Sequence, residues 1–242
     1  MNSVISIIIP TLREGPFLER TLKNFDNLSV PHEIIITDGG STDETLAVAR
    51  RYTDKITVWG ESRRQTFGEA KNAGAKLASG TFFVFIDADV IIPSPQTFFE
   101  EILGVFERNA TLVATTAPLK PYAENRSWVD AFFSAPLNWF YIVSNNLFHS
   151  GNSSGEFQMV RAEAFRKIGG FGEHLAAGED NELFRQLAAH GRTLSYRKLC
   201  VRHSLRRPHK LGWLRTYFIW IKNGLSVALR NKAAYKEWSV VR

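Results

Sequence analysis

Cysteine is almost missing from this chain, because Cys200 is the only one among 242 residues. A disulfide framework and a metal site built on cysteines are therefore excluded, and the composition fits a reducing compartment such as the cytoplasm. The first residues lack the basic flank and long apolar stretch of a signal peptide. No stretch offers about eighteen uninterrupted apolar residues, so no membrane-spanning helix is predicted.

Other signatures are missing as well. No Gly-x-Gly-x-x-Gly motif follows the first predicted strand, which disfavours a dinucleotide-dependent oxidoreductase. The chain has no internal repeats, and its 44% hydrophobic and 22% charged residues are an ordinary globular mix. Its length suits one large α/β domain, or one domain with an appendage. The net charge of +6 indicates an anionic partner: nucleic acid, a nucleotide or an anionic membrane surface.

Apolar strands alternate with amphipathic helices through the first half of the chain. Pro10 is expected to stop the first strand, and Ser41 to cap the second helix with Glu44 as its capping-box partner. Such short crossovers predict an α/β fold with a mostly parallel sheet and helices on both faces. The expected strands are 4–9, 33–37, 56–59, 82–86 and 112–116, and the expected helices are 16–28, 41–52, 67–78 and 95–108.

The second half of the chain has a different character. Residues 128–148 are rich in aromatic side chains, and 151–155 form a loop of small polar residues. A strand is expected at 157–160, and a turn follows at 169–172. A helix is then expected from Glu179 to about residue 190, and a last strand at 193–201.

Two carboxylates end the most apolar strand, 82–86. Asp87 and Asp89 are two residues apart, so their side chains point the same way and can converge on one point. The carboxyl ends of parallel strands are where open α/β sheets bind ligands, and Mg²⁺ or Mn²⁺ is held by carboxylates together with substrate phosphates. The pair therefore predicts a site for a divalent metal and a diphosphate, with a solvated turn as the alternative.

Further polar residues stand at comparable positions. Asp38 directly follows the second strand, where carboxylates commonly bind ribose hydroxyls or base N–H groups. Lys71 lies on the helix before the metal strand and could reach a phosphate, although helical lysines are usually solvated. Glu179 and Asp180 form a second acidic pair, either a favourable first helical turn or a general base held against the substrate. His203 follows the last strand and is a candidate third metal ligand.

Six short motifs follow one another between residues 3 and 204. In this order they resemble those of the family-2 glycosyltransferases, which have the GT-A fold, use nucleotide-sugar donors and invert the anomeric centre. The motifs are Ser6-Ile7-Ile8-Ile9-Pro10-Thr11, Ile35-Ile36-Thr37-Asp38-Gly39-Gly40-Ser41-Thr42-Asp43, Lys71-Asn72-Ala73-Gly74, Phe85-Ile86-Asp87-Ala88-Asp89, Gly169-Gly170-Phe171 and Glu179-Asp180.

The resemblance assigns roles to most of the donor side. It implies that Asp38 binds the base or the ribose, and that Lys71 faces the diphosphate at a position where the family often has arginine. Residues Pro10, Thr11 and Glu14 would line the nucleobase pocket.

It also assigns the reaction centre. Asp87 would contact the ribose, or the metal through water, while Asp89 would ligate Mn²⁺ or Mg²⁺. Asp180 would be the general base of an inverting transfer, with Glu179 at the substrate beside it. Two positions depart from the family pattern: Glu182 stands where aspartate is frequent, and Gly172 follows Gly-Gly-Phe where aspartate is common. Both bear on the acceptor.

The resemblance divides the chain into a catalytic domain, 1–204, and a tail, 205–242. Within the domain, 1–118 would bind the nucleotide and 119–204 the acceptor. The tail opens with a cationic cluster, 206–210, in which Arg206 is expected to reach the donor diphosphate. A basic amphipathic helix is expected at 211–230, either on an anionic membrane surface or packed on the core or a second subunit. The aromatic segment favours a cytoplasmic enzyme on the membrane face with a lipid-linked acceptor.

The leading hypothesis is therefore a metal-dependent glycosyltransferase with a nucleoside-diphosphate sugar as donor and a carbohydrate or lipid-linked acceptor. A sugar-1-phosphate nucleotidyltransferase is the alternative, but residues 10–14 lack its glycine-rich basic loop. A non-catalytic nucleotide-binding or nucleic-acid module is a third hypothesis. Its basic residues should form a groove interleaved with aromatics, whereas acids occupy the expected ligand edge here, so no nucleic-acid partner is expected.

Overall fold

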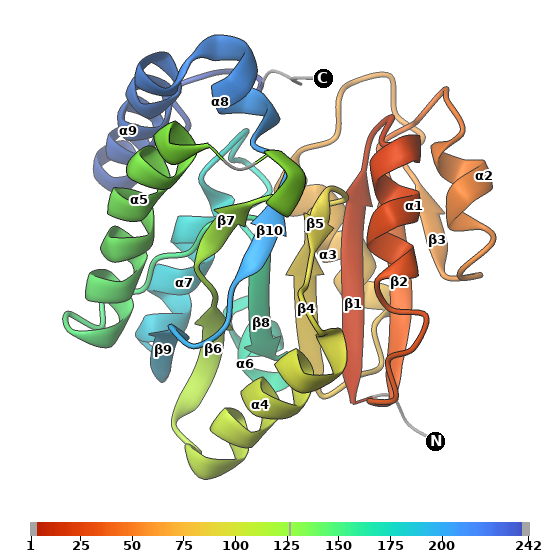
Figure 1. The fold of residues 1–242 in the computed structure, drawn as a ribbon, viewed down its shortest axis with the longest axis horizontal. Helices are drawn as coiled ribbons and strands as arrows, with labels where there is room; N and C mark the ends of the chain where they lie inside the picture. Colours follow the sequence, from red (N-terminus) through yellow and green to blue (C-terminus); the bar gives the residue numbers. More distant parts are fainter. Residues whose placement is uncertain (1–3, 126, 239–242) are drawn as a thin grey trace.

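A seven-stranded sheet forms the frame of the molecule (Figure 1). The computed structural model describes residues 4–125 and 127–238. The strand order is β3-β2-β1-β4-β8-β6-β9, and within the sheet as described β8 alone runs antiparallel to both its neighbours. The mostly parallel sheet predicted from the sequence is thus confirmed. The strands are β1 (Ile5–Thr11), β2 (His32–Asp38), β3 (Ile56–Val58), β4 (Phe82–Ile86), β6 (Leu112–Thr116), β8 (Phe157–Arg161) and β9 (Arg192–Ser195).

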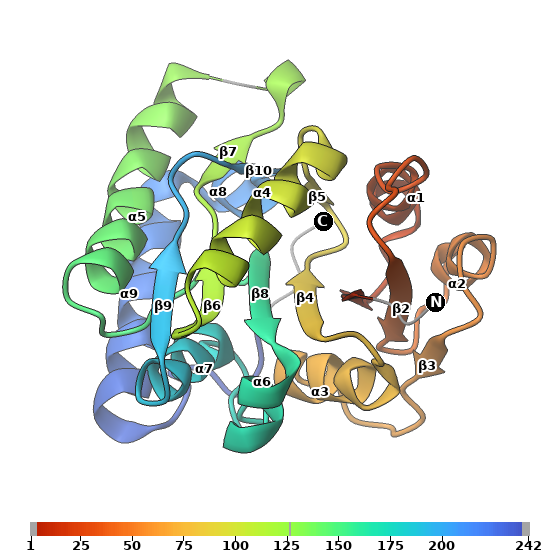
Figure 2. The same cartoon turned by 90° about the horizontal axis from the view of Figure 1, so that it is seen from below.

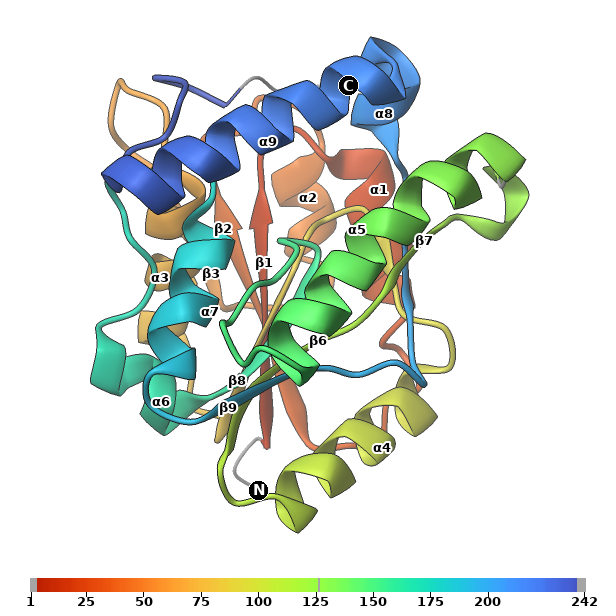
Figure 3. The same cartoon turned by 90° about the vertical axis from the view of Figure 1, so that its left-hand side faces the viewer.

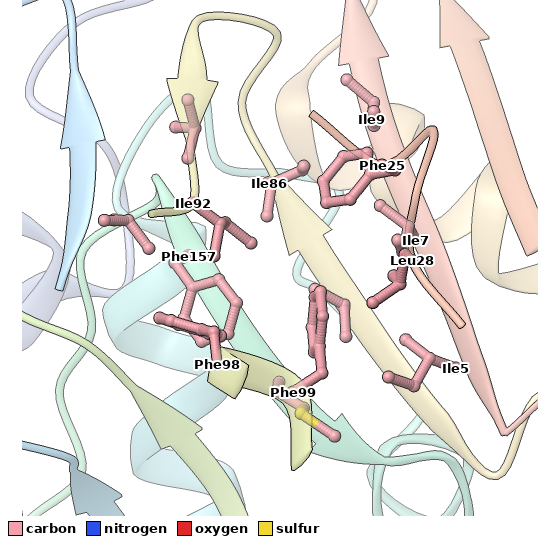
Figure 4. Close-up of a cluster of buried hydrophobic side chains, with 14 of the residues drawn as sticks. Ile5, Ile7, Ile9, Phe25, Leu28, Ile86, Ile92, Phe98, Phe99 and Phe157 are labelled. Atoms are coloured by element: carbon pink, nitrogen blue, oxygen red, sulfur yellow. The ribbon is translucent and has the colours of Figure 1, made fainter. Parts of the chain in front are cut away.

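Helices cover both faces of this sheet (Figure 2). Alternate residues of β1 point to opposite faces: Ile7 and Ile9 pack on the α1, α2 and α4 side, and Ile8 on the α3, α6 and α7 side. Figure 4 shows the first of these cores, where the rings of Phe98 and Phe157 meet edge to face at 5.1 Å. The helices are α1 (Gly15–Lys23), α2 (Thr45–Ala49), α3 (Phe67–Leu77), α4 (Pro95–Arg108), α6 (Ala162–Ile168) and α7 (Glu179–Ala188).

A second, three-stranded sheet stands beyond the end of β4. Its order is β5-β10-β7, from β5 (Val90–Ile91), β10 (Val201–His203) and β7 (Leu119–Pro121). The antiparallel pairing of β10 with β5 places His203 opposite Val90, the residue after Asp89. Through this pairing, residues 201–203 lie next to the turn that follows β4.

Three more helices gather beside that small sheet. They are α5 (Trp128–Asn146), α8 (Arg206–Leu211) and α9 (Trp213–Arg230), and a 3-10 turn (Ala123–Asn125) precedes α5. Helices α5 and α9 meet near their N-terminal ends, where the rings of Phe133 and Trp213 stack 5.4 Å apart, and they diverge from there (Figure 3). None of the helices described combines the length and apolar character that crossing a bilayer requires.

Two sequence-based expectations at the ends of β1 and β2 were wrong. Pro10 does not stop the strand, which continues to Thr11. Pro10 pairs with Thr37 of β2, whereas the pairing with β4 ends at Ile8, so the missing N–H of Pro10 interrupts no ladder on that side. Ser41 does not cap α2, because its hydroxyl bonds to Asp38 and the helix begins only at Thr45.

Three element boundaries also differ. The helix expected at 16–28 ends at Lys23, since the next backbone N–H groups bond back over three residues in tighter turns. The strand expected at 193–201 is two strands, β9 and β10, which pair in different sheets. The helix expected at 211–230 is preceded by α8 and separated from it by Gly212, whose φ of 84° is incompatible with a continuous helix.

Candidate active site

The turn after β4 brings a candidate metal site together. Asp87 directly follows the strand, and the turn is closed by a 3.2 Å hydrogen bond from the Val90 N–H to the Asp87 carbonyl. Single ligand atoms of Asp87, Asp89 and His203 all lie within 4.8 Å of one another. The structure therefore assembles the three residues that the sequence proposed as metal ligands.

Asp89 is the most strongly held of these groups. It is 2% exposed, with its Oδ2 atom 3.4 Å from Nε2 of His203 and 3.0 Å from Nη2 of Arg206, and it also accepts the hydroxyl of Ser204. Burial alone would raise the pKa of Asp89, but His203 and Arg206 hold it below its usual range. Burial conversely favours neutral His203, yet the Asp89 charge raises the pKa of this imidazole to about 9.

Asp87 is in a different electrostatic position. Burial raises its pKa well above the usual range; Lys71 opposes this, while Glu156 and Asp89 add to it. Two carboxylate oxygens and one imidazole nitrogen suit a divalent cation such as Mn²⁺ or Mg²⁺, and a cation there would offset the crowding of acids around Asp87. The residues present therefore fit the predicted metal.

The second acidic pair is clamped by a buried lysine. Lys71 is 1% exposed, and its Nζ atom lies 3.2 Å from Oε1 of Glu179 and 2.5 Å from Oδ1 of Asp180. Its charge is retained because the two acids outweigh the effect of burial on its pKa. The other oxygen of Asp180 lies beside Gly155, where an added Cβ would be only 2.7 Å away. Asp180 is thus fixed on both sides, and the predicted contact of Lys71 with a diphosphate stays a prediction.

Polar groups at the ends of β1 and β2 bond to one another. Thr11 and Asp38 are paired in register, and the Thr11 hydroxyl donates to Asp38 at 3.0 Å. The Asp38 carboxylate also accepts the N–H groups of Gly40 and Ser41 and the hydroxyl of Ser41. Asp38 therefore organises the loop after β2, and its expected contact with a base or ribose stays a prediction.

Arg206 joins this edge to the metal site. Its guanidinium lies 3.0 Å from Glu14 and 3.0 Å from Asp89, and over the ring of Phe17 at 4.6 Å. Arg206 can adopt this position because Leu205 before it takes a left-handed conformation with a φ of 53°. The cationic residue proposed for the diphosphate thus bridges two predicted site residues.

The two departures from the family pattern meet in space. A Cβ on Gly172 would lie 2.0 Å from Oε2 of Glu182, and that oxygen has no hydrogen-bond partner among the residues described. The longer side chain of Glu182 therefore fills the room that a side chain at 172 would need. The two differences are one local change.

Glu156 is the site residue that the sequence analysis missed. The register between β4 and β8 ends at Ile86 opposite Phe157, so the next residues, Asp87 and Glu156, face each other beyond the ladder. The Glu156 charge raises the pKa of Asp87 and of His203. An antiparallel strand begins at the edge where its parallel neighbours end, so an acid just before 157 could have been noticed had the direction of that strand been known.

Comparison with known proteins identifies the family. The family described as glycosyl transferase family 2 matches residues 6–169, more than half of the chain. The chain therefore belongs to glycosyl transferase family 2.

Two curated glycosyltransferases show what the chain is similar to in sequence. A validoxylamine A glucosyltransferase of Streptomyces hygroscopicus subsp. jinggangensis is 28% identical over 227 residues, covering 78% of this chain and 52% of that protein. The O-antigen chain rhamnosyltransferase WbaN of Salmonella anatum is 28% identical over 187 residues, covering 74% and 57%. The chain spans about half the length of these relatives.

Solved structures agree on the fold. A mannosyltransferase of Pyrobaculum calidifontis in complex with GDP-Man and Mn²⁺ has a TM-score of 0.72 at 19% identity, covering 93% of this chain and 62% of that one. TarS 1–349 of S. aureus in complex with UDP-GlcNAc has a TM-score of 0.61 at 18% identity, covering 81% and 55%. The predicted GT-A fold is thereby confirmed.

Proposed function

We propose that this chain is an inverting, metal-dependent glycosyltransferase that moves a sugar from a nucleoside diphosphate to a hydroxyl or phosphate acceptor. The observation that carries the proposal is the placement of two acid clusters on either side of segment 155–156. Asp87, Asp89 and His203 form one cluster, and Asp180 in the grip of Lys71 belongs to the other. The GDP-Man, Mn²⁺ and UDP-GlcNAc bound in the structural neighbours support a nucleotide-sugar donor and a divalent metal.

The donor would be oriented by the edge of the sheet. Residues 10–14 and Asp38 would hold the nucleoside, within the nucleotide-binding half, 1–118. Arg206 would give up part of its bonding to Glu14 and Asp89 in order to bind the diphosphate. The positive charge of the buried Lys71 would also attract the diphosphate. A divalent cation held by Asp87, Asp89 and His203 would offset the negative charge that develops on the departing diphosphate.

The transfer itself would be a direct displacement. Asp180 takes the proton of an acceptor hydroxyl while that oxygen forms its bond to the anomeric carbon. The bond from this carbon to the diphosphate oxygen breaks, its electron pair leaves with the nucleoside diphosphate, and the configuration at carbon inverts. Lys71 holds the Asp180 carboxylate in place before the transfer, and Glu179 offers the lysine a second carboxylate partner.

A binding panel followed by product analysis tests this proposal. UDP-, GDP- and dTDP-sugars are screened by thermal shift with and without Mn²⁺, and we expect one donor to raise the melting temperature only with the metal. The anomeric configuration of the transferred or slowly hydrolysed sugar is then read by proton NMR. A metal-independent response, or retention of the donor's configuration, would contradict the proposed mechanism.

We also propose that the acceptor is presented at an anionic lipid surface on the cytoplasmic side. The outer stripe of α9 is apolar and open to solvent, with Leu214 76% and Phe218 66% exposed, and Ile221, Leu225 and Leu229 continue it. Neighbouring α5 adds exposed Trp128, Phe132, Trp139 and Phe140. Because Arg215, Lys222 and Arg230 flank the stripe and are exposed, the face combines apolar side chains with positive charge, as interfacial helices do.

Liposome co-sedimentation tests the lipid proposal. Neutralising Arg215, Lys222 and Arg230 together to glutamine should weaken binding to anionic vesicles by roughly a hundredfold, at about 1 kcal/mol for each charge. The matched control neutralises three exposed lysines elsewhere, Lys76, Lys120 and Lys167. If the wild-type chain stays in the supernatant with phosphatidylglycerol vesicles at low salt, the face is an interface with protein instead.

A further inference from the structure

Three polar side chains of segment 154–158 have no hydrogen-bond partner among the described residues. Gln158 is fully buried, yet neither atom of its amide has a hydrogen-bond partner among the described residues, and the same holds for the buried hydroxyl of Ser154. Between them, Glu156 makes no hydrogen bond or ion pair within residues 4–125 and 127–238. Buried polar groups are nearly always paired, so a run of unpaired ones calls for an explanation.

Segment 154–158 faces the reaction centre. Side chains alternate along β8, and Phe157 and Met159 point into the core beneath α4. Gln158 therefore points to the opposite face, on the side of α3 and α7. Glu156, in the turn just before β8, lies close enough to Asp87 and His203 for its charge to raise the pKa of both. Asp87 lies on this face as well, two residues after Phe85, which packs there with Phe165 and Phe171.

The position of the segment fits the sugar of a bound donor. Gly155 lies against Asp180, the proposed base, and Glu156 follows it opposite Asp87, one of the proposed metal ligands. In a displacement the anomeric carbon must sit between the metal-bound phosphate and the base. The segment 154–158 runs between those two points, and Glu156 is not one of the grouped metal ligands.

The polar side chains of segment 154–158 favour a sugar ring with several hydroxyl groups as the ligand. An unpaired buried polar group costs about 1–3 kcal/mol, and hydroxyl groups can both donate to and accept from the side chains present here. A carboxylate accepts hydrogen bonds from neutral hydroxyls, but it repels a second carboxylate. A uronic acid is therefore a poor occupant of this place, whereas a neutral hexose satisfies it.

We propose that Glu156, which is half-buried at this edge, recognises the hydroxyl groups of the transferred sugar and selects neutral hexoses over uronic acids. This inference rests on the proposed function, because it presumes a nucleotide-sugar donor. It adds a specificity-determining residue that the sequence motifs do not contain.

Calorimetry with Mn²⁺ separates the sugar from the rest of the donor. The probes are UDP, UDP-glucose and UDP-glucuronate, together with GDP, GDP-mannose and GDP-mannuronate, on wild type, Glu156→Gln and the control Glu163→Gln. Glu163 is an exposed acid on α6 that loses the same charge. We expect wild type to bind a neutral donor at least roughly tenfold more tightly than its uronate, the lower end for one charged hydrogen bond. In Glu156→Gln this preference should shrink, while affinity for the bare diphosphate stays unchanged.

The outcomes are distinguishable. If wild type binds the diphosphate but takes the uronate as tightly as the neutral sugar, the inference on Glu156 is overturned and donor binding stands. Equal preference in Glu156→Gln and Glu163→Gln would overturn it too. If no nucleotide of the panel binds with Mn²⁺, the proposed function fails first and the inference with it. The wild-type comparison needs no variant, so a Glu156→Gln protein that misfolds would not prevent the test.

Discussion

The two ends of the ligand-binding edge treat their polar side chains differently. At the ends of β1 and β2, Thr11, Asp38 and Ser41 bond to one another and to the loop backbone, and the Asp38 side chain accepts four hydrogen bonds; only the buried hydroxyl of Thr37 beside them lacks a partner among the described residues. Across the sheet, the buried polar groups of Ser154 and Gln158 have no partner among the residues described.

This difference separates two ways of preparing a site. A saturated network fixes the shape of its loop before any ligand arrives, so what it offers to a nucleoside is shape and backbone. The unpaired buried groups of Ser154 and Gln158 cost stability in the free protein, and the half-buried Glu156 between them keeps its hydrogen-bonding capacity for a ligand. Active sites frequently carry such a local cost.

The largest effect is expected at the base. Asp180→Asn keeps the size of the side chain and its contact with Lys71 but cannot take up a proton at neutral pH. We expect kcat to fall by roughly a hundredfold to ten-thousandfold while donor affinity stays near that of wild type. Initial rates and calorimetry on the same preparation check this, with Asp54→Asn, an exposed acid, as control. Near-normal turnover would mean that Asp180 is not the general base and is only an acid of the first turn of α7.

The next effect is expected at the metal site. Asp89→Ala should abolish metal-dependent nucleotide binding. It should also cost stability, but less than the about 3–5 kcal/mol of a broken buried ion pair, because Arg206 is only half-buried and still pairs with Glu14. Asp89→Asn serves as the matched variant that keeps the volume. Unchanged nucleotide affinity with Mn²⁺ in Asp89→Ala would remove Asp89 from the metal site.

Two substitutions test whether the two ends of the ligand-binding edge differ in hydrogen bonding. Asp38→Ala should destabilise the fold by about 1–3 kcal/mol or more, since it strands the donors of its loop. Gln158→Leu, which replaces a buried amide unpaired among the described residues by an apolar side chain of similar size, should leave the free energy of unfolding unchanged or raise it. Urea denaturation measures both. A comparable loss of stability in Gln158→Leu would mean that its amide is paired in solution and that the contrast does not exist.

The smallest effect belongs to a paired acid far from the site. Burial opposes ionisation of Glu33, but hydrogen bonds from Lys55, Ser6 and Ser79 lower its pKa from 4.5 to about 2. The stability that Glu33 contributes is therefore present above pH 4.5 and is lost as the pH falls toward 2. We expect Glu33→Gln to flatten the fall of melting temperature between pH 5 and pH 3, and the exposed control Glu107→Gln to leave it unaltered.

The sequence predicted what depends on local pattern. Asp87 and Asp89 could be placed because a buried strand and the two acids after it are adjacent in the chain. The mostly parallel sheet followed from the alternation of strands and helices. The association of His203 with the same site was a hypothesis from its position after a strand, and it holds only because β10 pairs with β5.

Contacts between distant segments were beyond the sequence. Lys71 and Glu179 are 108 positions apart, and nothing local indicates that the lysine is buried between acids rather than solvated. Glu156 was missed because the direction of β8 decides which of its ends lies at the site. Ser41 looked like a helix cap, but bonding to Asp38 prevailed over capping. The tail boundary at 204 stays a prediction.

The most direct measurement is a crystal structure of Asp180→Asn with Mn²⁺ and the donor identified in the panel. We expect the metal between Asp87, Asp89 and His203, and the sugar ring between residue 180 and Asp87. At least one sugar hydroxyl should lie within about 3.2 Å of the Glu156 carboxylate. A donor bound with its sugar turned away from Glu156 would contradict the proposed sugar site.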